Sequence, residues 1–193
     1  MGQQGLKRER SDAARNRRAI LDATDELLAQ FGAGNISIEQ IAAAAGVGKG
    51  TIFHRFGSRA GLMEALVVER AQALREAVID GPPPLGPGAP AADRLLAFFD
   101  AMFELIVDNV ELMRAHDNAT SHAQADEINA FWHRHIAGLL IEARPDVDAT
   151  ILARVLLSTL DPDVVLHHIR TRHTARLAAT IHSLIAAVVA QGD

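Results

Sequence analysis

The segment 37–56, SIEQIAAAAGVGKGTIFHRF, constrains the fold of this chain more than any other stretch. Ser37 is a favourable helix N-cap, and Gln40 stands three residues later, where a capping box places its reciprocal acceptor. Ile36 and Ile41 have the spacing of a hydrophobic staple around that cap. The segment therefore predicts a short helix that begins sharply, followed by a second helix after a tight turn, as in a helix-turn-helix.

The turn and the second helix support this prediction. Gly46 stands where a left-handed residue would end the first helix, and Gly57 would close the second. Between them, Lys49, Thr51 and His54 carry donors that suit phosphates and base edges in a DNA groove. The alternative is a surface helix with ordinary solvated charges. The cap, the glycines and the basic segment upstream favour a DNA-reading helix.

Composition places the chain among globular proteins and argues against several other classes. It has 193 residues, 49% of them apolar, which is ample material for a core, and no cysteine, which excludes disulfides and thiolate metal sites. The polar N-terminal segment predicts no secretory signal, and the longest apolar run, 184–190, is too short to cross a bilayer. We therefore expect a cytoplasmic protein with no membrane partner.

The net charge of −5 conceals an uneven distribution along the chain. Residues 1–60 contain nine Lys or Arg against six acidic residues, whereas the remainder is strongly acidic. Attraction to a polyanion is a property of one local surface, so a basic N-terminal part is compatible with DNA binding.

The hydrophobic pattern is helical throughout, with no period-two alternation, so we predict an all-α protein. Residues 1–14 are expected to form a flexible basic arm, 15–60 a three-helix helix-turn-helix domain, and 61–193 a larger helical domain. The proline-rich segment 81–90 should be a loop or a stiff linker. Beyond it, helices are expected near 91–109, 111–118, 122–143, 147–160, 162–172 and 174–190.

The arrangement resembles the TetR family of transcriptional regulators. The resemblance covers about residues 15–70 and rests on RRAILDATDELLAQFG as the first helix, the segment 37–56, and SRAGLMEALV opening a long helix. It implies a homodimer whose reading helices enter successive major grooves of a palindromic operator. It also implies that a small apolar or amphipathic effector binds the larger domain and releases the operator, which relieves repression. The alternatives are a transcriptional activator of the same fold, or a helical binding protein or enzyme with a vestigial reading head.

The resemblance also assigns candidate DNA contacts. Those on the recognition helix are Lys49, Gly50, Thr51, Phe53 and His54. Ser37 and Arg59 would lie near the backbone phosphates, and Arg15 and Arg18 follow directly after the basic arm. The chain departs from the family where Gly48 replaces a common hydroxyl residue and Phe53 a common tyrosine. Ala60 and Gly61 replace the usual acidic pair, which predicts a poorer cap for the following helix.

Scarce aromatic and methionine side chains gather in the larger domain, as in an effector cavity, although ordinary core packing explains the same spacing. The candidate effector contacts are Phe99, Met102, Phe103, Ile106, Met113, His116, Trp132 and His167. The histidine spacing provides no two-ligand clasp, so we expect no metal and assign the histidines to polar pocket contacts or the surface. The alternative is a metal site at which one histidine of a pair converges with His116 or His122. No catalytic motif is present, so neither an enzyme nor a cofactor is expected.

Two apolar stripes near the end of the chain predict a dimer interface in the form of a four-helix bundle. Its candidate residues are Leu156, Leu160, Leu177, Ile181, Leu184, Ile185 and Val188. The alternative is that these stripes complete the core of a single subunit.

Overall fold

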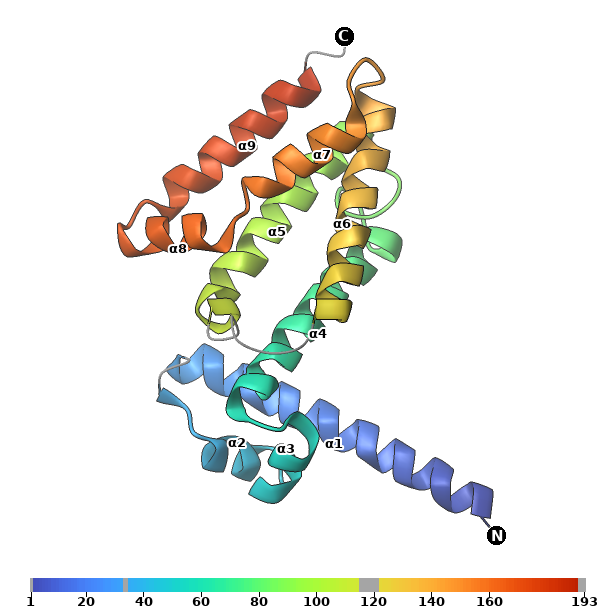
Figure 1. Cartoon of the computed structure of the whole chain (residues 1–193), viewed down its shortest axis with the longest axis vertical. Helices are drawn as coiled ribbons and strands as arrows, with labels where there is room; N and C mark the ends of the chain where they lie inside the picture. The colour runs from blue at the N-terminus through green and yellow to red at the C-terminus, as the bar shows by residue number, and fades with distance from the viewer. Residues whose placement is uncertain (1, 33–34, 115–121, 191–193) are drawn as a thin grey trace. The chain divides into compact units, whose positions relative to one another are not determined.

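The structure, a computed structural model, describes residues 2–32, 35–114 and 122–190 (Figure 1). All regular secondary structure within these ranges is helical, which confirms the all-α prediction. The chain divides into two compact units between Glu69 and Arg70, inside one helix, somewhat later than the boundary expected near residue 60. None of the described helices has a stretch long and apolar enough to span a bilayer.

The first unit contains α1 (Gly2–Phe31), α2 (Ile38–Ala44), α3 (Lys49–Phe56) and the beginning of α4 (Arg59–Asp80). Its core consists of side chains from all four helices: Ile20, Leu21, Thr24, Ile38, Ile41, Ile52, Leu62 and Leu66. The one polar member, Thr24, is satisfied within its own helix, because its hydroxyl donates to the carbonyl of Ile20 at 2.6 Å.

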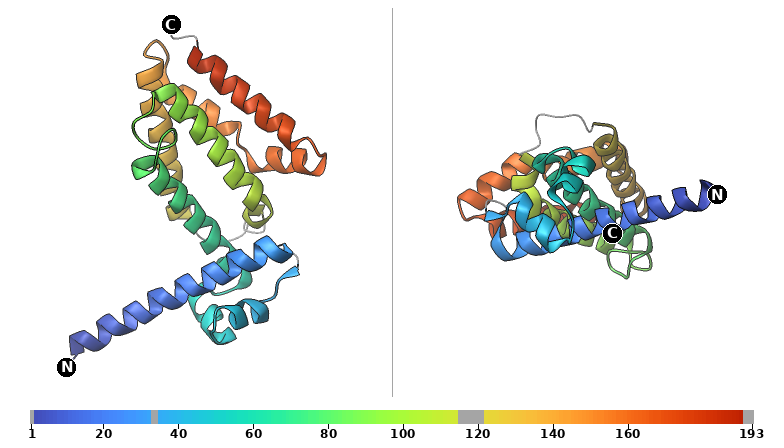
Figure 2. Two further views of the ribbon diagram at one scale, coloured as in Figure 1. Left: turned by 180° about the vertical axis from the view of Figure 1, so that it is seen from behind. Right: turned by 90° about the horizontal axis from the view of Figure 1, so that it is seen from below.

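The backbone of residues 2–14 differs from the expected flexible arm, because α1 is continuous from Gly2 (Figure 2). The segment has no apolar repeat, but it is rich in Gln, Lys, Arg, Glu, Leu and Ala, which are strong helix formers. Once the later turns of α1 are anchored in the core, each added residue extends an existing helix and avoids the cost of nucleation.

The second unit is built around α5 (Ala91–Arg114), which contacts α6 (His122–Ala143), α8 (Pro162–Arg170) and α9 (Thr174–Ala190). The remaining helix, α7 (Ala149–Ser158), packs against α6 (Figures 1 and 2). The most deeply buried side chains come from these helices and from the end of α4: Val78, Leu95, Phe98, Phe99, Ile136, Leu140, Leu156 and Ile185.

The helix α5 continues to Arg114, where we expected a break near residue 110 and a separate helix over 111–118. The polar residue at the expected break is Asn109, which is 1% exposed. Its side chain donates to the carbonyl of Leu105 at 2.7 Å and accepts from Arg70 on α4. These bonds satisfy the amide inside the helix. The last part of the expected helix, 115–118, lies outside the described residues.

Two predicted helix boundaries are confirmed further along the chain. The carboxylate of Asp161 accepts hydrogen bonds from the backbone N–H groups of Asp163 and Val164, and Pro162 occupies the first helical position of α8. The proline-rich segment between Gly81 and α5 forms no helix, as expected of a loop.

A buried arginine joins the ends of two helices in the second unit. Arg144, at the end of α6, contacts both oxygens of Asp146, at 2.8 and 2.7 Å, and also donates to the carbonyl of Val188 in α9. The hydrogen bond from Arg144 lowers the pKa of Asp146 to about 2, against the opposing effect of burial. This contact fixes the turn after α6 against the last helix.

Candidate functional site

The predicted capping box at the start of α2 is present. The Ser37 hydroxyl accepts from the backbone N–H of Gln40 at 3.2 Å, and the Gln40 amide oxygen accepts from the backbone N–H of Ser37 at 2.7 Å. Gly46 and Gly57 have φ values of 66° and 72°, which is the left-handed conformation that glycine adopts without steric cost. The cap and both glycines therefore hold α2 and α3 in a helix-turn-helix.

The short helix α3 is anchored by one face and exposed on the other. Ile52 is completely buried and fixes the helix in the core of the first unit. Lys49, Gly50, Phe53 and His54 are exposed, and Phe53 retains 42% of its accessible surface. An exposed aromatic ring flanked by donors on a rigid helix is a suitable surface for contact with another molecule.

Lys49, at the start of α3, contacts two neighbouring side chains. Its ammonium group pairs with the carboxylate of Glu39 on α2 and lies 5.9 Å from the centroid of the Phe53 ring. The hydrogen bond from Lys49 is the main cause of a lowered Glu39 pKa. Sequence reasoning selected Lys49 as a DNA contact but did not anticipate that Glu39 would compete for its charge.

The other candidate DNA contacts occupy the surrounding helices. A guanidinium nitrogen of Arg59 donates to the carbonyl of Ile36 at 3.3 Å, which links the start of α4 to the segment before α2. On α1, Arg15 is exposed, and Arg18 is 72% exposed while lying 3.8 Å from Asp22 and 3.5 Å from Glu69.

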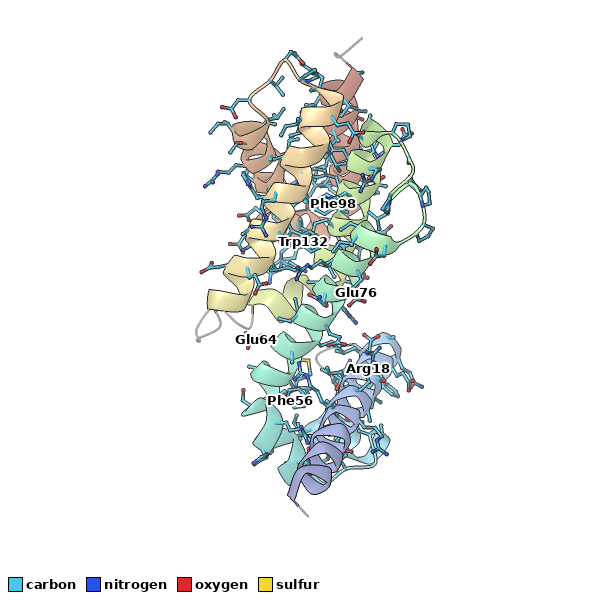
Figure 3. All side chains as sticks on the ribbon, turned by 90° about the vertical axis from the view of Figure 1, so that its right-hand side faces the viewer. Arg18, Phe56, Glu64, Glu76, Phe98 and Trp132 are labelled. Atoms are coloured by element: carbon cyan, nitrogen blue, oxygen red, sulfur yellow. The ribbon has the colours of Figure 1, made fainter. Side chains whose placement is uncertain are left out.

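Thr51 and Ser37 are half-buried, and the Ser37 hydroxyl oxygen is engaged in the capping box. Sequence reasoning missed the contact of Arg17, whose guanidinium lies 5.3 Å from the centroid of the Phe56 ring. Figure 3 shows the neighbouring Arg18 on α1 and Phe56 at the end of α3. The Arg17–Phe56 contact ties these two helices together.

The start of α4 explains one departure from the family pattern. Ser58 accepts from the backbone N–H of Gly61 at 3.0 Å, so its hydroxyl caps the start of α4. A Cβ at position 61 would lie 2.1 Å from the carbonyl oxygen of Phe56. The close approach of these two backbone segments requires glycine at this position in the present turn.

The aromatic concentration of the second unit forms a packed core. Phe99, Met102, Phe103, Ile106 and Trp132 all belong to one cluster of buried side chains. Trp132 lies 5.5 Å from Phe98, centroid to centroid, and Figure 3 shows the two side by side.

Of the candidate effector contacts, Phe99 and Phe103 line a pocket of about 200 Å³ between α5 and α9, together with Asp100, Glu104, Ala178 and Ile181. His167 is exposed on α8, and its ring contacts His168. The Met113 side chain and His116 lie outside the described residues.

The candidate dimer residues divide into two groups. Leu156, Leu160, Ile181 and Ile185 are buried in the core of a single subunit, so their apolar stripe serves internal packing. Leu184 is 43% exposed, and Leu177 and Val188 are partly buried. Two further apolar side chains of the same stripe as Leu156 are exposed on α7, Ile151 at 58% and Val155 at 54%.

Comparison with known proteins agrees with this geometry. The profile described as "Bacterial regulatory proteins, tetR family" matches residues 20–66, which run from α1 through the helix-turn-helix into α4. Over these residues, the chain is similar to the TetR family of bacterial regulatory proteins. The HTH-type transcriptional regulator BetI of Escherichia coli O17:K52:H18 is 39% identical over 88 residues, 46% of this chain and 45% of BetI. BetI of Cronobacter sakazakii is 38% identical over 46% of this chain and 43% of its own length.

The chain thus matches less than half the length of these curated relatives, whereas the fold is shared over most of its length. A TetR-family regulator from Rhodococcus sp. has a TM-score of 0.61 at 21% identity, over 91% of this chain and 99% of that one. FadR from Bacillus subtilis in complex with stearoyl-CoA has a TM-score of 0.59 at 19% identity, over 89% and 97%. At these identities the likeness shows the fold alone.

Proposed function

We propose that this protein is a DNA-binding transcriptional regulator that represses from a palindromic operator and is released by a small-molecule effector. The observation that carries the proposal is the exposed face of α3, where Lys49, Gly50, Phe53 and His54 are presented by a helix anchored through Ile52. A helix with one buried face and one donor-bearing face can enter a major groove without loss of its own packing.

The proposed DNA contacts fall into two kinds. Lys49 and His54 on α3 would reach base edges or nearby phosphates, with Gly50, Thr51 and Phe53 in contact with the groove walls. Ser37, Arg59, Arg15 and Arg18 would contact the backbone, where charge sets the affinity and its salt dependence. The match of residues 20–66 to the tetR family of bacterial regulatory proteins supports this role.

A homodimer is part of the proposal, because two reading helices are needed for a palindrome. We place its interface on the exposed apolar side chains of α7 and α9, namely Ile151, Val155 and Leu184, with Leu177 and Val188 at the edge. The shared fold with FadR, which was solved with stearoyl-CoA, supports a small-molecule effector, and we propose the second unit as its site.

The test is selection from a random-sequence duplex pool with the purified full chain at near-physiological salt. We expect a palindrome whose half-sites are about one helical turn apart, and this site then serves as a reporter operator for repression. Folded, dimeric protein that recovers no motif would contradict DNA reading. A site that raises transcription in the reporter would instead identify an activator.

A further inference from the structure

Three polar groups in the second unit are buried without a hydrogen-bond partner among the described residues. They are the Nε atoms of Arg75 on α4 and Arg94 on α5, and Nε2 of His135 on α6. A buried polar atom without a partner costs about 1–3 kcal/mol, so native proteins contain few of them. Three such groups on three neighbouring helices call for a functional explanation.

One aromatic ring connects two of these groups. The Arg75 guanidinium lies 4.7 Å from the centroid of Phe131, and the His135 ring is stacked on the same side chain with an interplanar angle of 5° and a centroid distance of 6.1 Å. His135 also packs against Phe98 at 5.3 Å. Phe131 itself is only partly buried, so part of this residue is accessible to solvent.

Two of the three groups are arginines, and Arg94 lies near enough to His135 to affect its pKa. Burial is the main cause of a His135 pKa near 4, and the nearby Arg94 charge lowers it further. His135 is therefore a neutral imidazole at physiological pH. Two guanidinium forks beside a neutral ring nitrogen match the planar, bidentate hydrogen bonding of a carboxylate.

We propose that Arg75, Arg94 and His135 bind the carboxylate of an amphipathic organic acid whose apolar part lies against Phe131. This inference rests on the proposed effector response and specifies the class of effector. The aromatic ring supplies apolar contact area, and the two arginines supply the charge that distinguishes an acid from a neutral analogue. Binding would join α4, which carries Arg75 and also belongs to the DNA-reading unit, to α5 and α6.

The chain contains its own probe for this site, because its single tryptophan, Trp132, lies 4.9 Å from Phe131. We would titrate the full chain with decanoate, decanamide and decyl phosphate, and follow Trp132 fluorescence and binding heat. Decanoate should bind at least about tenfold more tightly than decanamide, since a charge-assisted hydrogen bond distinguishes them. Equal affinity for the acid and the amide, or no binding of decanoate, would overturn the proposal. Tighter binding of decyl phosphate than of decanoate would show that the site prefers a phosphate group, which would also overturn the proposal.

The variants Arg94→Gln and Arg75→Gln should each weaken decanoate binding about tenfold or more and leave decanamide binding unchanged. Arg134→Gln, on the same helix as His135 but exposed, is the matched control and should change neither affinity. Arg94→Lys retains the charge without the planar fork, so its affinity should lie between those of wild type and Arg94→Gln, and it supplies a second variant should the first fail to fold. Wild-type affinity for decanoate in folded Arg94→Gln and Arg75→Gln would contradict the assignment.

The operator selection separates this proposal from the proposed function. A protein that recovers a palindrome but does not bind decanoate keeps its proposed regulatory role and loses the acid site. A protein that binds decanoate through Arg94 but recovers no DNA motif keeps the acid site and loses the regulatory role. Release of the selected operator by decanoate, abolished in Arg94→Gln, is the result expected if both are correct.

Discussion

At the scale of single residues, Glu39 and the proposed DNA target would compete for the ammonium group of Lys49. Lys49 is paired with Glu39 in the structure, so contact with DNA would exchange one partner for another. Both side chains are more than half exposed, so their mutual attraction is weak in water. We therefore expect Lys49 to leave Glu39 at little cost when a phosphate or base edge is offered.

Replacement of Lys49 with alanine should weaken binding to the selected operator by about 1–3 kcal/mol if Lys49 makes a base contact. Competition binding with operators altered at each half-site position measures the effect. Relaxed preference at one position would identify a base contact, and an equal loss on every sequence would identify a phosphate contact. Unchanged affinity would show that Lys49 does not contribute to the DNA interface.

The opposite result is expected for Glu39→Gln. This change removes a negative charge from the reading surface and frees the Lys49 ammonium, so DNA affinity should rise by up to about 1 kcal/mol, or roughly fivefold. The gain should shrink as salt is raised. Titration of wild type and variant against one operator at two salt concentrations measures it, with Glu26→Gln, exposed on α1, as the control. A loss of affinity would mean that Glu39 positions Lys49 for its contact.

His135 should make stability depend on pH. Its folded pKa of about 4 lies below the ordinary value of 6.5, so the unfolded chain binds more protons between these values. Stability is therefore complete above pH 6.5 and falls as the pH decreases toward 4. Wild type should lose more stability than His135→Phe over this range, by less than about 1.4 kcal/mol per pH unit, the limit for one proton. Urea unfolding at several pH values measures the difference, and parallel curves would contradict it.

At the scale of helices and turns, the structure shows which features a sequence can predict. The capping box of Ser37 and Gln40, the left-handed Gly46 and the start of α8 at Pro162 are local features. Each depends on residues within a few positions, and each was predicted. The continuity of α5 through Asn109 depends on Arg70, 39 residues away, and was not. The cluster of Arg75, Arg94 and His135 also joins distant segments, and no local pattern distinguishes these residues from solvated charges.

The turn between α3 and α4 provides a test of one such element. Gly61→Ala would place a Cβ 2.1 Å from the Phe56 carbonyl oxygen, so the backbone must shift. We expect a loss of about 1–3 kcal/mol in unfolding free energy, as in other overpacked sites. Thermal or urea unfolding measures it, with Gly50→Ala as control, because nothing lies within 4 Å of a Cβ there. Equal stability of the two variants would show that the turn relaxes freely.

At the scale of the whole molecule, sequence periodicity located apolar stripes but did not assign them to the core or to an interface. The helices α7 and α9 are apolar on more than one side, so both assignments satisfied the same pattern. Packing against α5 assigns Ile181 and Ile185 to the core and leaves Leu184 exposed, although all three lie within five residues.

The substitutions Leu184→Glu and Ile181→Glu should therefore have different outcomes. Leu184→Glu places a charge on the proposed interface, so the protein should stay folded, have half the wild-type mass in light scattering and lose operator affinity. Ile181→Glu buries a charge in the subunit core and should prevent stable folding. A dimer of unchanged mass for folded Leu184→Glu would show that the surface around Leu184 is not the dimer interface.

The contact of Arg144 with Asp146 and the Val188 carbonyl also limits how the chain can be engineered. Truncation before residue 188 would remove an acceptor and leave a guanidinium that is 8% exposed with one fewer partner. Shortening the last helix would therefore loosen a turn more than forty residues upstream, at the end of α6. Tags and fusion partners should be attached after this helix, with all of its turns intact.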